Sequence, residues 1–306
     1  MSWFIIALLG YLVLALVSIS DKFILSKKIA TPAVFVFLST GPLFLLFLSL
    51  FFGVKILFIS DLFLAAISGL GLLFGFWAMY KGFLASEVSH AGPLLGAVIP
   101  TFVLLLSIGV GGEILTDKQL AACLFLILGS FLISFEKSKL HSGWHRGFLW
   151  IILAGVMFAI SHITAKYLYD TQGFAAGLIW TRGFSGFFGL ILLLTPSVRN
   201  EICSWFQNKK CLPKENLENK NNRTGLILFN KVFGVVGVLL VQFATSLGSV
   251  SLVNSLAGFQ FGLLVILVAL LSLFYPKIFK EEYSKLEVVQ EVIAVVVIGV
   301  GLSLLI

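Results

Sequence analysis

Ten strongly apolar stretches, each close to the length that crosses a lipid bilayer, dominate this 306-residue sequence. A helix needs roughly 20 apolar residues to cross the hydrocarbon core. Because a helix satisfies its backbone hydrogen bonds internally, runs of this length predict membrane-spanning helices. The stretches are residues 3–19, 33–52, 61–80, 88–110, 119–135, 147–165, 174–194, 226–247, 250–274 and 287–306.

The composition excludes a soluble protein. Hydrophobic residues make up 59% of the chain and charged residues only 11%, whereas a soluble domain needs far more charge to cover its surface. We therefore expect an all-α polytopic membrane protein with ten transmembrane helices, located in the cell (inner or plasma) membrane. The net charge of +7 belongs to the loops and indicates contact with membrane lipids that carry anionic headgroups, not with nucleic acid.

Similar segments recur in the two halves of the chain. Residues 250–258 align with residues 88–96 at one constant offset, and residues 162–167 align with residues 18–23. Five helices in each half is an odd number, so the two halves would insert with opposite orientation. The sequence thus predicts two inverted five-helix repeats. The expected divisions are a first repeat at 1–135, a connecting loop at 136–146, and a second repeat at 147–306 with a polar loop at 195–224.

Loop charges predict the orientation in the membrane. Most lysines and arginines fall in loops that follow odd-numbered helices. Loops after even-numbered helices carry Lys55 and Lys118, and also Lys166 if the sixth helix ends early. Because cytoplasmic loops are enriched in basic residues, the odd loops are expected in the cytoplasm and both termini outside.

The stretch from Glu87 to Glu113 contains two prolines within one apolar run, Pro93 and Pro100. Prolines inside a helix remove backbone donors and bend it. The freed carbonyls need partners on neighbouring helices or in a hydrated cavity. We expect Pro93 and Pro100 to act as hinges beside such a cavity; a kinked helix that only packs is the alternative.

Ionisable residues within the apolar stretches are few, and Arg182 and His162 are the most informative. A charge at the depth expected for Arg182 costs roughly 2.5–3.5 kcal/mol on insertion scales unless it is paired or hydrated. Arg182 would hold an anionic group, or it would bind carbonyls freed by a kink in a neighbouring helix. His162 would bind substrate or bridge two helices. Candidates for the walls of a central cavity are Trp77, His90, His162, Trp180, Arg182, Asn254 and Gln260.

The chain resembles the drug/metabolite transporter superfamily, in particular its ten-helix proteins of the EamA type. The resemblance extends over nearly the whole chain and rests on the order of several motifs rather than on one. These motifs are Ser89–Leu95, Pro100, Gly111–Gly112–Glu113 followed by Leu115–Thr116, Leu128–Gly129 and Arg182. The chain departs from the family pattern in having Ile114 where an arginine is typical and an insertion at Tyr275–Lys277.

The resemblance implies a secondary transporter or exporter of a small organic metabolite that works by alternating access, with both termini in the cytoplasm. A lipid-linked substrate flippase, or a membrane-embedded partner subunit, is the alternative. The sequence has no phosphate-binding loop and no nucleophile–base or metal-ligand spacing. We therefore expect no enzyme, no cofactor and no metal, and a monomer or homodimer whose partners are its small-molecule substrate and lipids.

Overall fold

The computed structural model describes residues 2–25, 32–85, 88–134, 146–196, 198–200, 203, 220–274 and 285–306. Within these ranges, the side chains of residues 20–25, 32–35, 88–90, 146, 220–231, 271–274 and 285–287 are not described.

Helices hold 92% of the described residues, and none of those residues forms a strand. The α-helices are α1 (Ser2–Leu25), α2 (Pro32–Thr40), α3 (Ile59–Ala85), α4 (Val88–Gly109), α5 (Asp117–Ser134), α6 (Arg146–Gln172), α7 (Phe174–Ile191), α9 (Lys220–Leu247), α10 (Val250–Ser255), α11 (Ala257–Phe274) and α12 (Lys285–Leu305). Two 3-10 segments, η1 (Gly41–Phe52) and η2 (Leu192–Leu194), continue α2 and α7.

Each apolar stretch of the sequence overlaps one or two of these helices. Among the described residues, eight helical segments are long and apolar enough to cross a membrane. Two further apolar helical segments, Val36–Phe52 and Val232–Leu247, are shorter. The chain is therefore an all-α, multi-pass membrane protein.

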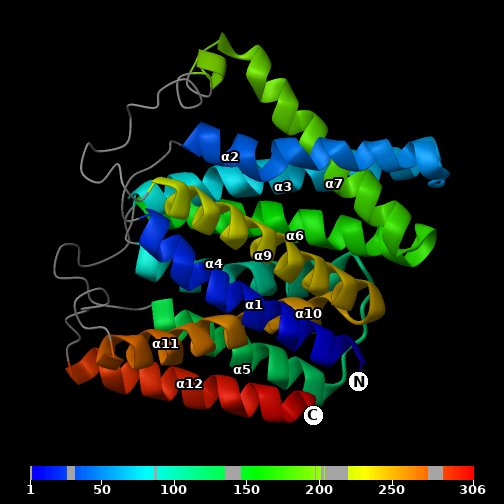
Figure 1. Cartoon of the computed structure of the whole chain (residues 1–306). Helices are drawn as coiled ribbons and strands as arrows, with labels where there is room; N and C mark the ends of the chain where they lie inside the picture. The colour runs from blue at the N-terminus through cyan, green and yellow to red at the C-terminus, as the bar shows by residue number, and fades with distance from the viewer. Residues whose placement is uncertain are drawn as a thin grey trace.

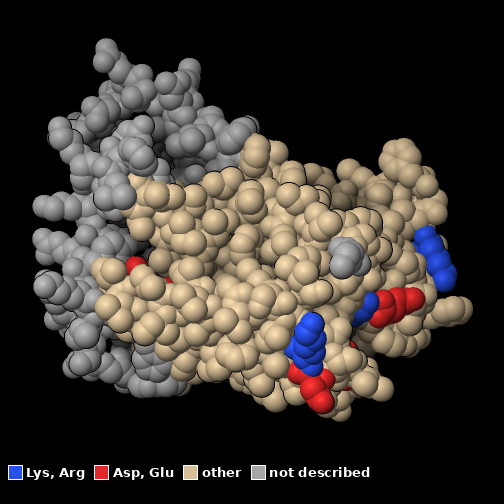
Figure 2. All heavy atoms as spheres, turned by 90° about the horizontal axis from the view of Figure 1, so that it is seen from below, with Lys and Arg blue, Asp and Glu red and all other residues tan. Residues whose placement is uncertain are grey.

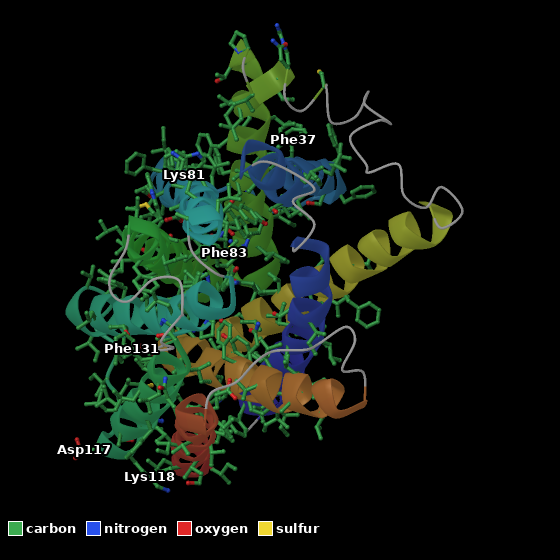
Figure 3. All side chains as sticks on the ribbon, turned by 90° about the vertical axis from the view of Figure 1, so that its left-hand side faces the viewer. Phe37, Lys81, Phe83, Asp117, Lys118 and Phe131 are labelled. Carbon is green, nitrogen blue, oxygen red and sulfur yellow. The ribbon has the colours of Figure 1, made fainter. Side chains whose placement is uncertain are left out.

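The helices form one bundle in which partners distant in sequence lie side by side. α3 packs along α6, α1 along α9 and α5 along α12. Seen end-on, α2 and α7 lie at one edge and α12 at the opposite edge, with α1 and α9 together on one side (Figure 3). Both termini lie at the same end of the bundle (Figure 1). We call this the short-loop end, because residues 53–58, 110–116, 173 and 248–249 connect the helices there.

α7 and η1 approach each other closely enough for their backbones to touch. Gly183, Gly186 and Gly189 follow one another at a spacing of three residues along α7. A Cβ at Gly186 would lie 2.0 Å from the backbone nitrogen of Phe44, and one at Gly183 would lie 2.5 Å from the Phe47 ring. In a 3-10 helix, side chains three residues apart align, so a glycine at every third position of α7 matches the ridge of η1.

The outer surface of the bundle is apolar along the helices and charged at the short-loop end. Most of the described charged side chains visible in Figure 2 gather at that end. Large apolar side chains are exposed along the outer faces of α9 and α12. Such faces suit contact with lipid tails. They include Val232, Val235, Val236, Val238, Leu239, Val288, Val289, Val292, Ile293 and Val296.

Candidate functional site

His162 and Arg182 lie at about the same depth in the bundle, on the two helices that Gly173 connects. Gly173 joins α6 to α7 and adopts φ 84°, a left-handed conformation that favours glycine. His162 lies 11 residues before it and Arg182 nine residues after it. At a rise of about 1.5 Å per residue, both lie roughly 15 Å from the short-loop end, which is half the thickness of a hydrocarbon core.

Arg182 is buried without a compensating group. Its side chain is 5% exposed. None of its three guanidinium nitrogens has a hydrogen-bond partner among the described residues. Its neighbours are the His162 ring and the Tyr169 hydroxyl, whose own proton is donated to Gln242. A full positive charge at this depth therefore lacks a carboxylate within the described part of the chain, although such a charge is costly in an apolar medium.

The groups around Arg182 come from four helices and are hydrogen-bonded to protein. The Tyr169 hydroxyl donates to Gln242 Oε1 of α9 at 2.9 Å. Thr181 Oγ1 donates to the Gly177 carbonyl at 2.7 Å. Asn254 of α10 donates from Nδ2 to the Val250 carbonyl at 2.8 Å and also interacts with the His162 ring. We call this set the central polar cluster: His162, Tyr169, Thr181, Arg182, Gln242 and Asn254.

His162 contributes a second unsatisfied group to the cluster. Its Nδ1 is buried and has no hydrogen-bond partner among the described residues, while part of its side chain remains accessible. Buried polar atoms are almost always paired in folded proteins. The unpaired Nδ1 of His162 and the unpaired guanidinium of Arg182 together indicate a place for a bound group.

The helix that carries Asn254 is irregular beside it. α10 ends at Ser255 and α11 begins at Ala257, after a single turn residue, Leu256, which keeps right-handed helical dihedral angles. A Cβ at Gly258 would lie 2.6 Å from the carbonyl oxygen of Leu126, so this segment rests directly on α5. The sequence shows no proline at this point, and the irregularity was not expected.

The structure brings three of the predicted site residues together and places others elsewhere. His162, Arg182 and Asn254 belong to the central polar cluster. Trp180 instead donates from its indole nitrogen to the Lys55 carbonyl at 3.0 Å. Gln260 donates to the hydroxyl of Ser18 at 3.2 Å.

Trp77 lies nearer the opposite end of the bundle. Both α3 and α7 start at the short-loop end, and Trp77 lies ten residues further from the start of its helix than Arg182 does. The two side chains are therefore separated by about 15 Å along the bundle axis. Its ring contacts Trp150 at a centroid distance of 5.3 Å, and the Lys81 ammonium lies 3.8 Å from its centre. Lys81 is labelled in Figure 3. The side chain of His90 lies outside the described residues. The binding role of all seven residues stays a prediction.

Both prolines lie within α4, which continues from Val88 to Gly109. Pro93 and Pro100 are buried. Near them, a Cβ at Gly96 would lie 2.0 Å from the Phe261 ring, so α4 and α11 are in close contact there. The hinge role of the two prolines stays a prediction.

A second polar contact ties the loop after α4 to the start of α10. Ser251, which is 1% exposed, donates to the Glu113 carboxylate and shares a hydrogen bond with Ser107. Glu113 thus lies near the amino end of α10, where the helix dipole favours a negative charge. This contact gives the Gly-Gly-Glu sequence a structural role at the short-loop end.

Replacing Ser251 with alanine is expected to lower the free energy of unfolding by about 1.5–3 kcal/mol, because it removes a hydrogen bond to a charged group. Thermal unfolding of the purified variant in detergent measures this loss. Ser303→Ala is the control, since Ser303 is exposed and bonds only its own helix at Val300. Equal melting temperatures for the two variants would contradict the contact.

Comparison with known proteins gives the fold alone. No family model matches the chain, and no curated protein matches it. A solved structure described only as "Crystal structure of protein" superposes with a TM-score of 0.64 over 99% of this chain and 98% of the other, at 15% sequence identity. Similarity at that level of identity supports a shared arrangement of helices over the full chain.

Proposed function

We propose that this chain is a secondary active transporter that moves a small organic metabolite across the cell membrane by alternating access. The observation that carries this proposal is the central polar cluster. An apolar, multi-pass bundle holds a buried arginine and a partly buried histidine at mid-depth, and the three guanidinium nitrogens and the histidine Nδ1 lack hydrogen-bond partners among the described residues. Ionisable groups inside a membrane protein commonly mark a path for substrate or ions.

We further propose that the ten helices form two inverted repeats of five. The short apolar segments are part of longer helices. α2 and η1 together reach about 37 Å, and the 28-residue α9 reaches about 42 Å. Both lengths exceed a hydrocarbon core of about 30 Å.

The packing of the helices supports this symmetry. In the proposed repeats, α1 corresponds to α6 and α3 corresponds to α9. Exchanging the two halves therefore turns the α1–α9 pair into the α6–α3 pair, and both pairs are observed. The same exchange turns the α4–α6 contact into the α11–α1 contact, which is also observed. The α5–α12 and α7–η1 pairs map onto themselves. A two-fold axis in the membrane plane is the symmetry of inverted repeats, and substrate sites lie where such repeats meet.

The proposal retains the EamA-type resemblance of the sequence and a location in the cell membrane, as a monomer or homodimer. Within the cluster, His162, Tyr169, Thr181 and Arg182 come from the first two helices of the second repeat. Gln242 and Asn254 come from its third and fourth helices. The first repeat packs against these helices through the α3–α6, α4–α6 and α7–η1 contacts.

Transport in proteoliposomes tests the proposal. Purified protein in sealed vesicles is expected to move at least one radiolabelled solute from a panel of carboxylates, amines, amino acids and sugars, at a rate that saturates with concentration. Protein-free vesicles provide the background. Flipping of a fluorescent lipid-linked sugar, without movement of any soluble solute, would overturn the proposal in favour of a flippase.

A further inference from the structure

The charge balance of the central polar cluster limits what it can bind. Arginine stays protonated in proteins, so Arg182 brings one full positive charge into the middle of the bundle. A ligand that carries one negative charge would neutralise it. A ligand with two negative charges would leave one of them uncompensated, and a cation would add a like charge, which is costly in a low dielectric.

Three of the described carboxylates near the short-loop end have partners of their own, and the fourth, Asp117, is exposed in the first turn of α5. Asp61 accepts a hydrogen bond from Gln172 at 2.6 Å. Glu113 accepts from Ser251, and Asp170 pairs with Lys166 at 2.7 Å. Within the described residues, the charge of Arg182 is thus left for a ligand to balance.

The shape of the unsatisfied donors favours a carboxylate. A guanidinium presents a planar fork of N–H groups that matches the two oxygens of a carboxylate. The His162 Nδ1, which is also without a partner among the described residues, can bond a second polar group next to that carboxylate. The Tyr169–Gln242 pair and Asn254 supply neutral polar surface, which suits the polar body of an organic molecule.

From these observations we propose that the site binds a small organic monocarboxylate, with its carboxylate on the Arg182 guanidinium and a neighbouring hydroxyl or carbonyl group on His162. This inference rests on the proposed transport function, because it assigns the substrate class of the same site. It names Arg182 as the residue that selects for charge and His162 as the residue that selects among carboxylates.

Ligand-induced thermal stabilisation in detergent tests the binding. The probes are sodium acetate, lactate and benzoate, each compared with its uncharged amide at equal concentration. Sodium chloride, disodium succinate and choline serve as inorganic, dianionic and cationic probes. At least one monocarboxylate is expected to raise the melting temperature in a saturable way, whereas its amide and the other probes do not. Equal shifts from chloride or the amide, or no shift from any monocarboxylate, would overturn the proposal.

Three variants assign the effect to the cluster. Arg182→Gln is expected to abolish the stabilisation, and Arg182→Lys, which keeps the charge but loses the fork, to weaken it at least about tenfold. His162→Gln is expected to change the preference among acetate, lactate and benzoate. Lys118→Gln, which removes an exposed positive charge from the start of α5, is the control and should bind normally. Normal carboxylate binding by both Arg182 variants would overturn the assignment.

The outcomes separate this inference from the transport function. Binding of a monocarboxylate without its movement into proteoliposomes would leave the site assignment standing and refute transport. Transport of choline or of an uncharged amide, with no binding or competition by any monocarboxylate, would leave transport standing and refute the substrate class.

Discussion

Replacement of Arg182 by methionine is expected to raise the melting temperature of the unliganded protein and to abolish the proposed transport of a monocarboxylate. The guanidinium is buried and has no partner among the described residues, so its removal relieves the cost of an uncompensated charge. Replacing even a buried ion pair by apolar residues of similar volume is often neutral or stabilising, by about 1–4 kcal/mol, and a buried charge without a partner has no attraction to lose. Methionine fills much of the same space with a flexible apolar chain.

Thermal unfolding followed by tryptophan fluorescence, together with uptake in proteoliposomes, measures the two effects. The same substitution at Arg199, which is exposed, is the matched control and is expected to change the free energy of unfolding by no more than about 0.5 kcal/mol. If the melting temperature of Arg182→Met instead falls, the side chain braces α7 against its neighbours, and its charge is compensated in the folded protein.

Replacing Gly186 with valine is expected to lower the free energy of unfolding by about 3 kcal/mol, the upper end of the usual range for overpacking, or to prevent accumulation of folded protein. A Cβ at this position would lie 2.0 Å from the backbone nitrogen of Phe44 and 2.6 Å from the carbonyl carbon of Leu43. Both are backbone atoms of η1, which cannot rotate away as a side chain can. Overpacking of this kind strains or separates the two helices. It would also shift the position of Arg182, which lies one turn away on α7.

Gly299→Val is the matched control, because a Cβ at Gly299 would meet no atom within 4 Å. In that open position, the change from glycine is expected to be neutral or slightly stabilising through helix propensity. Detergent melting curves and the yield of monodisperse protein compare the two variants. Similar curves would show that α7 and η1 do not pack backbone to backbone.

The sequence located the helices, but several of their limits differ from the apolar stretches, and α6 is the most instructive case. The apolar stretch at 147–165 predicts a helix that ends near Lys166, yet α6 continues to Gln172. Lys166 and Asp170 pair with each other at 2.7 Å across one turn, so these charges stabilise the last turns of the helix instead of ending it. Tyr169 was therefore not expected inside the bundle, although it lies seven residues from His162 and so shares its face.

Side-chain direction explains why some predicted site residues lie elsewhere. Trp180 and Arg182 are two residues apart on α7 and so do not share a face; Trp180 points toward Phe47, with ring centroids 5.5 Å apart. Trp77 lies outside the cluster because of its depth: α3 starts at the short-loop end, and Trp77 is further along the bundle than Arg182. The type of a residue shows that its polar group is costly in lipid, but it does not predict which residue that group will contact.

The sequence by itself determined that this is an all-α, multi-pass membrane protein and where its helices lie. The reason is that about 20 consecutive apolar residues are enough for a helix to be stable in the hydrocarbon core, whatever the rest of the chain does. It also identified Arg182, His162 and Asn254 as polar groups that need partners. Only the tertiary structure decided that these three meet and that Tyr169 and Gln242 join them. Those facts depend on contacts between segments up to 92 residues apart, from His162 to Asn254, and packing between helices sets them rather than the properties of any one helix.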